Sequence, residues 1–227
     1  MPSDAPVLGR RYAAYLFDLD GTLVDSAPDI TAALNAALRA VGQPAVDEEL
    51  TRHWVGHGSR VLIERAFEHA GAAAKIADEP TMARAIDAFI AHYRAHIADA
   101  SRPYPGVVAA LDELTRRGAR LAVVTNKLTA LSEQLLVALR LRPYFAAVVG
   151  GDTLAKRKPD AAPALHACRH MNVVASAALF VGDSTTDVET ARAAGCPVVC
   201  VRDGYNQGTP ADELGADGVI DSLIELL

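Results

Sequence analysis

Short apolar runs, bounded by turn residues, recur along the chain and predict buried strands. They lie at residues 12–17, 121–124, 145–149, 177–181 and 197–201, with a weaker candidate at 218–220. Helical patterns fill most of the intervals, at residues 107–117, 129–139, 161–171 and 185–194. Strands that alternate with helices of this length predict an α/β fold built on a doubly wound parallel sheet.

A helical block interrupts this alternation after the first apolar run. Its predicted helices lie at residues 30–41, 47–54, 59–70 and 80–98 and are rich in Ala, Leu, Glu and Arg, which are good helix formers. Pro28 before the first helix and Gly42 after it are typical helix boundaries. We therefore predict a core formed by residues 1–25 and 101–227, and an inserted helical domain formed by residues 26–100.

Two carboxylates end the first apolar run, in the sequence Asp18-Leu19-Asp20-Gly21-Thr22. Residues i and i+2 of a strand point the same way, and open α/β sheets bind ligands at the carboxyl ends of their strands. The pair therefore indicates a site for a divalent metal or a nucleophile. The alternative is an Asx-type turn that only ends a strand, because Asp and Gly favour turns for local reasons.

Two further polar groups follow later strands of the same predicted sheet. Thr125 and Asn126 precede a helix whose free N–H groups would favour a phosphate, although such a pair is also a common helix cap. Lys158 stands directly before a proline and a helix, where its charge could neutralise a carboxylate and an approaching phosphate. We interpret its neighbours Lys156 and Arg157 as solvated side chains.

Asp183 and Asp187 follow the run at residues 177–181 and enter a predicted helix. They would face Asp18 and Asp20 across one pocket, and like charges at this distance repel strongly unless a cation offsets them. Oxygen ligands without Cys or His nearby select Mg²⁺ rather than zinc. The sequence therefore predicts Mg²⁺ as the cofactor.

These residues, in this order, resemble the four motifs of the haloacid-dehalogenase-like phosphohydrolases, and the match spans nearly the whole chain. The resemblance implies a Rossmann-like core, and the inserted helices resemble the C1 cap of that superfamily. It implies that Asp18 attacks phosphorus to form an aspartyl-phosphate. Asp20 would protonate the leaving oxygen and then activate water.

The same resemblance implies a ligand set for the metal and the phosphoryl group. The Asp18 carboxylate, the Asp20 backbone carbonyl and Asp183 would bind Mg²⁺, with Asp187 close by or acting through water. Lys158 would steady Asp18 and the transferred charge. The phosphoryl group would be held by Thr125 and Asn126.

A narrower resemblance, to the phosphoglycolate phosphatases, rests on residues 55–58, 104–107, 123–127, 150–152 and 204–208. Gly56 and Gly58 leave the backbone free to present N–H groups at a helix start, which suits a small carboxylate. His57, Ser59 and Arg60 are candidates to assist, and an ordinary helix entry is the alternative.

Two positions depart from the narrower pattern, and neither removes a catalytic group. Ala161 stands where the family usually has a proline, and Thr186 where asparagine is common. The expected activity is hydrolysis of 2-phosphoglycolate to glycolate and phosphate. The alternatives are a sugar-phosphate phosphatase, a phosphosugar mutase of the same superfamily, and a non-catalytic ligand-binding protein on this fold.

Composition restricts the partners and the location. Of 227 residues, 51% are hydrophobic and 22% charged, which is typical of a globular enzyme. A net charge of −6 argues against nucleic acid as a partner. No apolar run approaches the ~18 residues of a membrane span, the first 11 residues lack a signal-peptide pattern, and the three cysteines lack zinc-site spacing. We expect a cytoplasmic enzyme whose partner is a small phosphorylated metabolite; the oligomeric state cannot be read from the sequence.

Overall fold

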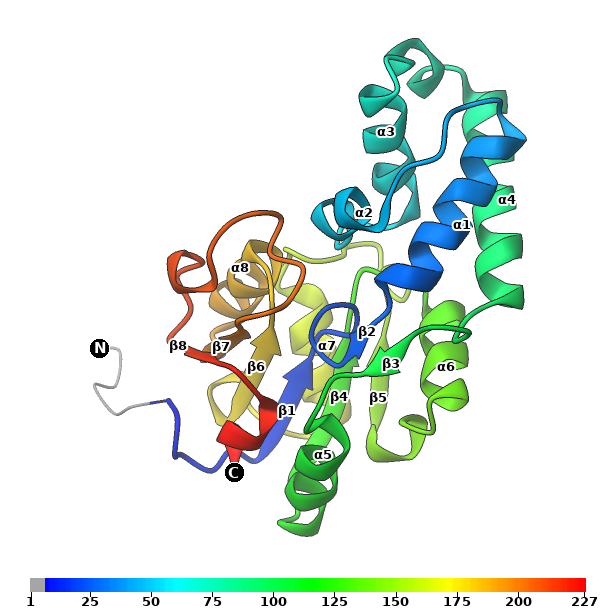
Figure 1. Cartoon of the computed structure of the whole chain (residues 1–227). Coiled ribbons are helices and arrows are strands. Elements are labelled where there is room, and N and C mark those ends of the chain that lie inside the picture. The colour runs from blue at the N-terminus through cyan, green and yellow to red at the C-terminus, as the bar shows by residue number, and fades with distance from the viewer. Residues whose placement is uncertain (1–6) are drawn as a thin grey trace.

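The computed structural model describes residues 7–227 and contains a six-stranded sheet with a group of helices above it (Figure 1). All neighbouring strands pair in parallel, in the order β5-β4-β1-β6-β7-β8. Their bounds are β1 Ala14–Phe17, β4 Arg120–Val124, β5 Ala147–Val149, β6 Ala178–Gly182, β7 Val198–Val201 and β8 Gly218–Ile220. The first strand lies in the middle and later strands extend outward on both sides, so the predicted doubly wound sheet is confirmed.

Alternate residues of the central strand, β1, belong to two separate hydrophobic cores, one on each face of the sheet. Tyr15 and Phe17 belong to the core under α5 (Val107–Arg116) and α6 (Thr129–Ala138). On the opposite face, Ala14 and Leu16 pack with α7 (Ala162–His170) and α8 (Thr185–Ala194). Because both faces of the strand are buried, its sequence is apolar throughout instead of alternating.

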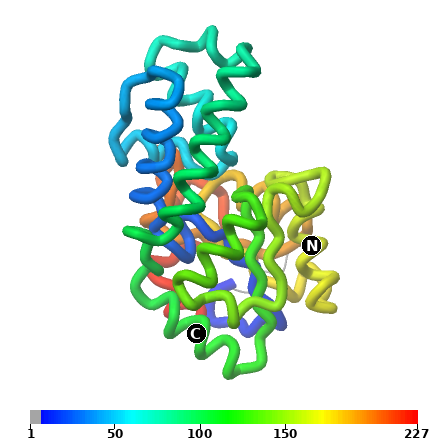
Figure 2. Tube along the Cα trace, turned by 90° about the vertical axis from the view of Figure 1, so that its right-hand side faces the viewer, coloured from blue at the N-terminus to red at the C-terminus, as the bar shows by residue number. Residues whose placement is uncertain are grey.

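Four helices between residues 26 and 96 pack on one another beyond the carboxyl edge of the sheet, and Figure 2 shows this unit standing above the rest. They are α1 Ala27–Ala40, α2 Glu48–Trp54, α3 Ser59–His69 and α4 Glu79–Ala95. We call residues 27–95 the cap. These helices fall within the predicted insertion, residues 26–100. The division of the chain into two domains at those residues stays our proposal. Residues 1–6 of the predicted core lie outside the described part of the chain.

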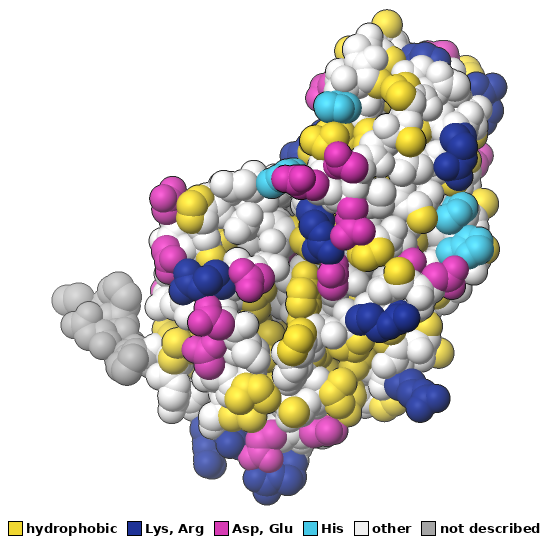
Figure 3. All heavy atoms as spheres, in the orientation of Figure 1, with side chains coloured by type: hydrophobic (Ala, Val, Ile, Leu, Met, Phe, Trp, Pro, Cys, Tyr) yellow, Lys and Arg dark blue, Asp and Glu magenta, His cyan; other side chains and the backbone are white. Residues whose placement is uncertain are grey.

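A two-stranded ribbon marks the place where the chain leaves the sheet and returns to it. β2 (Val24–Asp25) pairs antiparallel with β3 (Arg102–Pro103). The sequence analysis did not predict this ribbon, because two residues are too few to show a hydrophobic period. Figure 3 shows charged side chains of both signs where cap and sheet meet, and one ion pair there joins Arg52 of α2 to Asp25 at 2.8 Å.

The remaining helical elements are short 3₁₀ turns at Ala73–Ile76, Arg142–Tyr144, Ala175–Ala177, Ala211–Glu213 and Leu223–Leu226. Within residues 7–227, no helix is both long enough and apolar enough to cross a membrane. All three cysteines are buried and free.

Candidate active site

The register of three neighbouring strands brings the predicted catalytic residues together. Phe17 of β1 lies opposite Val123 of β4 and Val181 of β6. The three strands therefore end at one level of the sheet, and each is followed by polar residues where the backbone turns away. The polar residues that follow are Asp18 after β1, Thr125 after β4 and Asp183 after β6.

Lys158 lies between two carboxylates of the site. Its Nζ atom is 2.9 Å from Asp18 Oδ1 and 2.6 Å from Asp187 Oδ1, and its side chain is only 2% exposed. Burial lowers the pKa of an ammonium group, but the Asp18 and Asp187 carboxylates outweigh this and hold the pKa of Lys158 above its ordinary range. The lysine is therefore a fixed positive charge beside Asp18.

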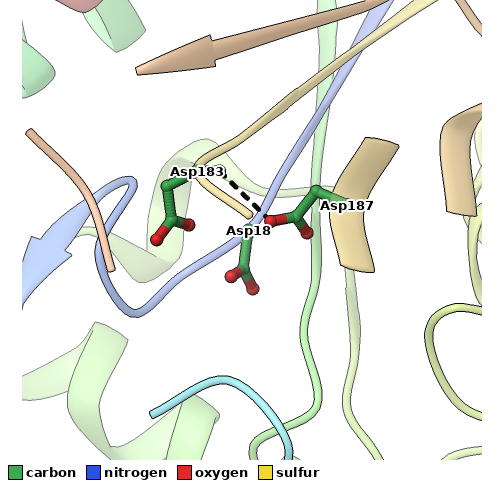
Figure 4. A group of neighbouring side chains, drawn as sticks. All are labelled: Asp18, Asp183 and Asp187. Carbon is green, nitrogen blue, oxygen red and sulfur yellow. Dashed lines mark hydrogen bonds between the residues drawn. The ribbon is translucent and has the colours of Figure 1, made fainter. Parts of the chain in front are cut away.

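Asp18, Asp183 and Asp187 form a buried acidic cluster, with one oxygen of each within 4.8 Å of the others (Figure 4). Burial raises the pKa of Asp18 to about 6; Lys158 opposes this shift, and the charge of Asp187 adds to it. Burial also raises the pKa of Asp183 well above its ordinary value, and the charges of Asp187 and Asp18 add to that shift. A nearby cation would favour the ionised form of both Asp18 and Asp183.

The hydrogen bonds within the cluster show which oxygens stay open to a ligand. Asp187 Oδ2 accepts from the N–H groups of Asp183 and Ser184 and from Ser184 Oγ, while Oδ1 contacts Lys158. Asp18 Oδ1 contacts the Lys158 ammonium and, within residues 7–227, accepts no hydrogen bond from any other group. Asp183 accepts one bond on each oxygen, so Asp18 and Asp183 keep free lone pairs. This set of hard oxygen donors fits a divalent metal ion.

The Asp20 carboxylate pairs with Lys127, a second lysine at this edge of the sheet. Lys127 Nζ lies 2.7 and 2.9 Å from its two carboxylate oxygens, and Ser26 Oγ donates a 2.5 Å hydrogen bond to Oδ1. The same ammonium lies 4.6 Å from the ring centroid of Tyr93, on α4 of the cap. Asp20 therefore contacts both the sheet edge and the first residues leading into the cap.

Thr125 and Asn126 are both buried where β4 ends. The Thr125 N–H bonds to Val149 O of the neighbouring strand, and its hydroxyl oxygen accepts from the Lys127 N–H. Asn126 Nδ2 donates to the carbonyl oxygens of Gly56 and Lys158, at 3.0 and 3.2 Å. The Asn126 amide therefore joins the cap loop to the sheet edge.

A cavity of about 250 Å³ lies between the cap and the end of the sheet. Its floor contains the polar side chains of Asp18, Asp20, Thr125, Asn126 and Lys127. The wall contains the apolar side chains of Ile30, Val55, Leu62, Phe89, Leu128 and Leu131. Gly56, Gly58, Ser59 and Arg60 contribute from the cap, and Gly151 and Arg157 from the sheet side. We call this space the active-site cavity.

The predicted cap residues divide into two groups. Gly56, Gly58 and Arg60 line the active-site cavity. His57 does not; its Nε2 lies 3.2 Å from Gln207 Oε1, on the loop after β7. The Arg60 guanidinium pairs with Glu64 at 3.0 Å and with Glu79 at 2.7 Å, so its charge is already offset.

Tyr205 connects the acidic cluster to the start of the cap. Its N–H donates to Asp183 Oδ2 at 2.6 Å, and its hydroxyl accepts from the N–H groups of Ser26 and Ala27 while donating to Asp25. The preceding glycine allows this approach, because a Cβ on Gly204 would lie 2.1 Å from Asp183 Cβ.

Comparison with known proteins agrees with this arrangement of strands and acids. Residues 15–201 match the model of the family described as haloacid dehalogenase-like hydrolase. The chain belongs to the haloacid dehalogenase-like hydrolases. The match covers both the cap and most of the sheet, and it includes the predicted catalytic acids and Lys158.

Several relatives are named phosphoglycolate phosphatase. The chain is 48% identical over 190 residues to a phosphoglycolate phosphatase of Mesorhizobium japonicum, covering 84% of this chain and 82% of the relative. It is 40% identical over 212 residues to a phosphoglycolate phosphatase of Thiobacillus denitrificans, covering 93% and 92%. A crystal structure of a predicted phosphoglycolate phosphatase from Haemophilus somnus superposes with a TM-score of 0.90 at 35% identity, covering 96% and 97%.

Four residues to which the sequence patterns assigned no role of their own join the contacts around the predicted site: Lys127, Tyr93, Tyr205 and Thr22. Lys127 follows Asn126 directly, so a basic residue beside a predicted phosphate site was an available signal. Tyr93 is four residues after Phe89 on α4, and that spacing indicates only a buried helix face.

Proposed function

We propose that this enzyme is a Mg²⁺-dependent phosphomonoesterase that hydrolyses 2-phosphoglycolate to glycolate and phosphate through an aspartyl-phosphate on Asp18. The Asp18 carboxylate lines the active-site cavity, and the Lys158 ammonium holds its Oδ1 atom at 2.9 Å. It is therefore placed to attack a phosphorus atom from the sheet side. A cytoplasmic location is part of the same proposal.

The metal would be held by Asp18, the Asp20 carbonyl and Asp183, where it would offset negative charge on the acids and on the phosphoryl group. Asp187 supports this site from behind, because both of its oxygens are occupied by protein donors. Lys158 keeps its positive charge beside Asp18 and stabilises the transferred group.

Asp20 serves as the acid and then the base, and Thr125 and Asn126 position the phosphoryl group. Asp20 lines the cavity two residues after the nucleophile, so its carboxyl group can reach an oxygen leaving on the opposite side from Asp18. Deprotonated Asp20 then takes the proton of the water that cleaves the aspartyl-phosphate. Thr125 and Asn126 lie on the floor of the same cavity.

The cavity is the observation that carries the choice of substrate. Its volume of about 250 Å³ lies below the range of about 300–1,000 Å³ that is usual for larger ligands. Beyond Asp18, Asp20, Thr125 and Asn126 its lining is mostly apolar, with three cations and the hydroxyl groups of Ser59 and Tyr93. A small anion fits this lining better than a sugar phosphate, whose hydroxyl groups need several polar partners.

The test is phosphate release from a panel of substrates, with Mg²⁺ and with EDTA. We expect kcat/KM for 2-phosphoglycolate to exceed the values for hexose phosphates and nucleotides, and EDTA to abolish turnover. A preference for a hexose phosphate would keep the mechanism and overturn the substrate. Transfer of phosphate to a sugar instead of water would identify the mutase alternative.

A further inference from the structure

Three cationic side chains line the active-site cavity, and two of them are already neutralised. They are Arg60, Lys127 and Arg157. Lys127 contacts both oxygens of Asp20 and is 6% exposed. Arg60 is shared between two glutamates of the cap. Both cations are therefore already matched by carboxylates of the protein before a substrate binds.

Arg157 is the third cation, and it makes no ion pair with any carboxylate in residues 7–227. It directly precedes Lys158, the lysine that contacts Asp18. Its Nη1 atom lies 3.6 Å from the position that a Cβ would occupy on Gly58. The Arg157 side chain therefore extends from the sheet side of the cavity to the cap loop. In the chain it stands next to Lys158, at the proposed phosphoryl site.

Arg157 and Lys156 are both exposed, as predicted, but they differ in their contacts. Lys156 is 69% exposed and pairs with Asp160 at 2.8 Å, away from the cavity. A guanidinium presents N–H groups in a planar fork that matches the two oxygens of a carboxylate. Gly58 and Ser59, at the start of α3, line the same cavity and add N–H groups that favour an anion.

We propose that Arg157 binds the carboxylate of the substrate and is the residue that selects a phosphomonoester carrying a second negative charge on a short carbon chain. This assignment rests on the proposed function. The phosphoryl end of the substrate lies at Asp18 and Lys158, and its carboxylate end lies between Arg157 and the start of α3.

The experiment compares two substrates that differ in the carboxylate: 2-phosphoglycolate and ethyl phosphate, with a bisphosphate of similar length as a third. Each is assayed with the wild type, Arg157→Gln, Arg157→Lys and the matched control Lys156→Gln, which removes the same charge one residue away. We expect Arg157→Gln to lower kcat/KM for 2-phosphoglycolate about 10- to 100-fold, mainly through KM. Turnover of ethyl phosphate should stay within about twofold, and Lys156→Gln should resemble the wild type on both.

The outcomes separate the two proposals. If the wild type does not prefer 2-phosphoglycolate to ethyl phosphate, the proposed substrate is wrong, whatever the variants do. If the wild type has this preference and Arg157→Gln keeps it, the Arg157 assignment is wrong and the proposed function stands. Equal losses on both substrates would show a general structural role and would also refute the assignment. An Arg157-dependent preference for the bisphosphate would refute the carboxylate as the group that is bound.

Discussion

Asp18→Asn should stabilise the metal-free enzyme at neutral pH while abolishing turnover. The substitution keeps the shape of the side chain and removes one negative charge from a buried cluster. In that cluster three carboxylates lie around one lysine, Lys158. The pKa of Asp18 is raised from 3.8 to about 6 in the folded protein. A carboxyl group whose pKa is raised on folding binds its proton more tightly in the folded state, so folding becomes less favourable as the pH rises from about 4 to 6.

The size of the effect follows from that difference. Two pKa units correspond to about 3 kcal/mol of unfolding free energy at pH 7, at about 1.4 kcal/mol per unit. For a chain of this length, 3 kcal/mol corresponds to about 6 to 12 °C in Tm. The gain should be present at pH 7 and should fall below about 1 kcal/mol near pH 4, where Asp18 is protonated in the folded state and about half protonated in the unfolded state.

The assay is thermal unfolding of both proteins after dialysis against EDTA, at pH 4 and pH 7, and again at pH 7 with Mg²⁺. Mg²⁺ should raise the Tm of the wild type much more than that of Asp18→Asn, because the variant lacks one of the two open carboxylates. A variant that is less stable than the wild type in EDTA at pH 7 would refute the argument. Equal stabilisation of both proteins by Mg²⁺ would refute the assignment of Asp18 as a ligand.

Three other substitutions test separate parts of the site. Asp20→Asn should lower kcat about 10²- to 10⁴-fold. The Tm increase caused by Mg²⁺ should remain, because only the backbone carbonyl of Asp20 is assigned to the metal. Normal turnover of this variant would exclude Asp20 as the acid and base. Tyr205→Phe leaves the N–H groups of Ser26 and Ala27 without an acceptor. It should lower the unfolding free energy measured in urea by about 2–4 kcal/mol. An unchanged midpoint and slope of the urea unfolding curve would contradict this. Gly204→Ala forces a Cβ against Asp183 and should weaken Mg²⁺ binding about 10-fold or more in a calorimetric titration; unchanged affinity would show that Asp183 can move without loss.

The fold and the acidic cluster could be predicted because both depend on local patterns. A buried parallel strand is an apolar run, and the residue at which the run ends is visible in the sequence. In a parallel sheet, strand ends meet at one edge, so Asp18, Thr125 and Asp183 converge once the strands are found. The repulsion expected between these acids then indicates a cation without knowledge of their distances.

The partners of the predicted residues could not be read in the same way. Ser26 precedes α1 and is a standard cap residue, yet its side chain bonds to Asp20 and the helix start is capped by the Tyr205 hydroxyl from 178 or 179 residues away. Nothing local in the sequence relates Tyr205 to that helix. Only the packing of the loop after β7 against the acidic cluster brings it there.

The same limit explains why Lys156 and Arg157 could not be separated from the sequence. Both are basic, adjacent and in one loop, and composition predicts a solvated position for each. Both are exposed in the structure, as that composition predicts. They differ in their contacts, because Lys156 pairs with Asp160, while Arg157 lines the active-site cavity and lies close to Gly58 of the cap. These contacts depend on how the cap packs against the sheet edge, so cations beside Lys158 should be assigned from packing and not from composition.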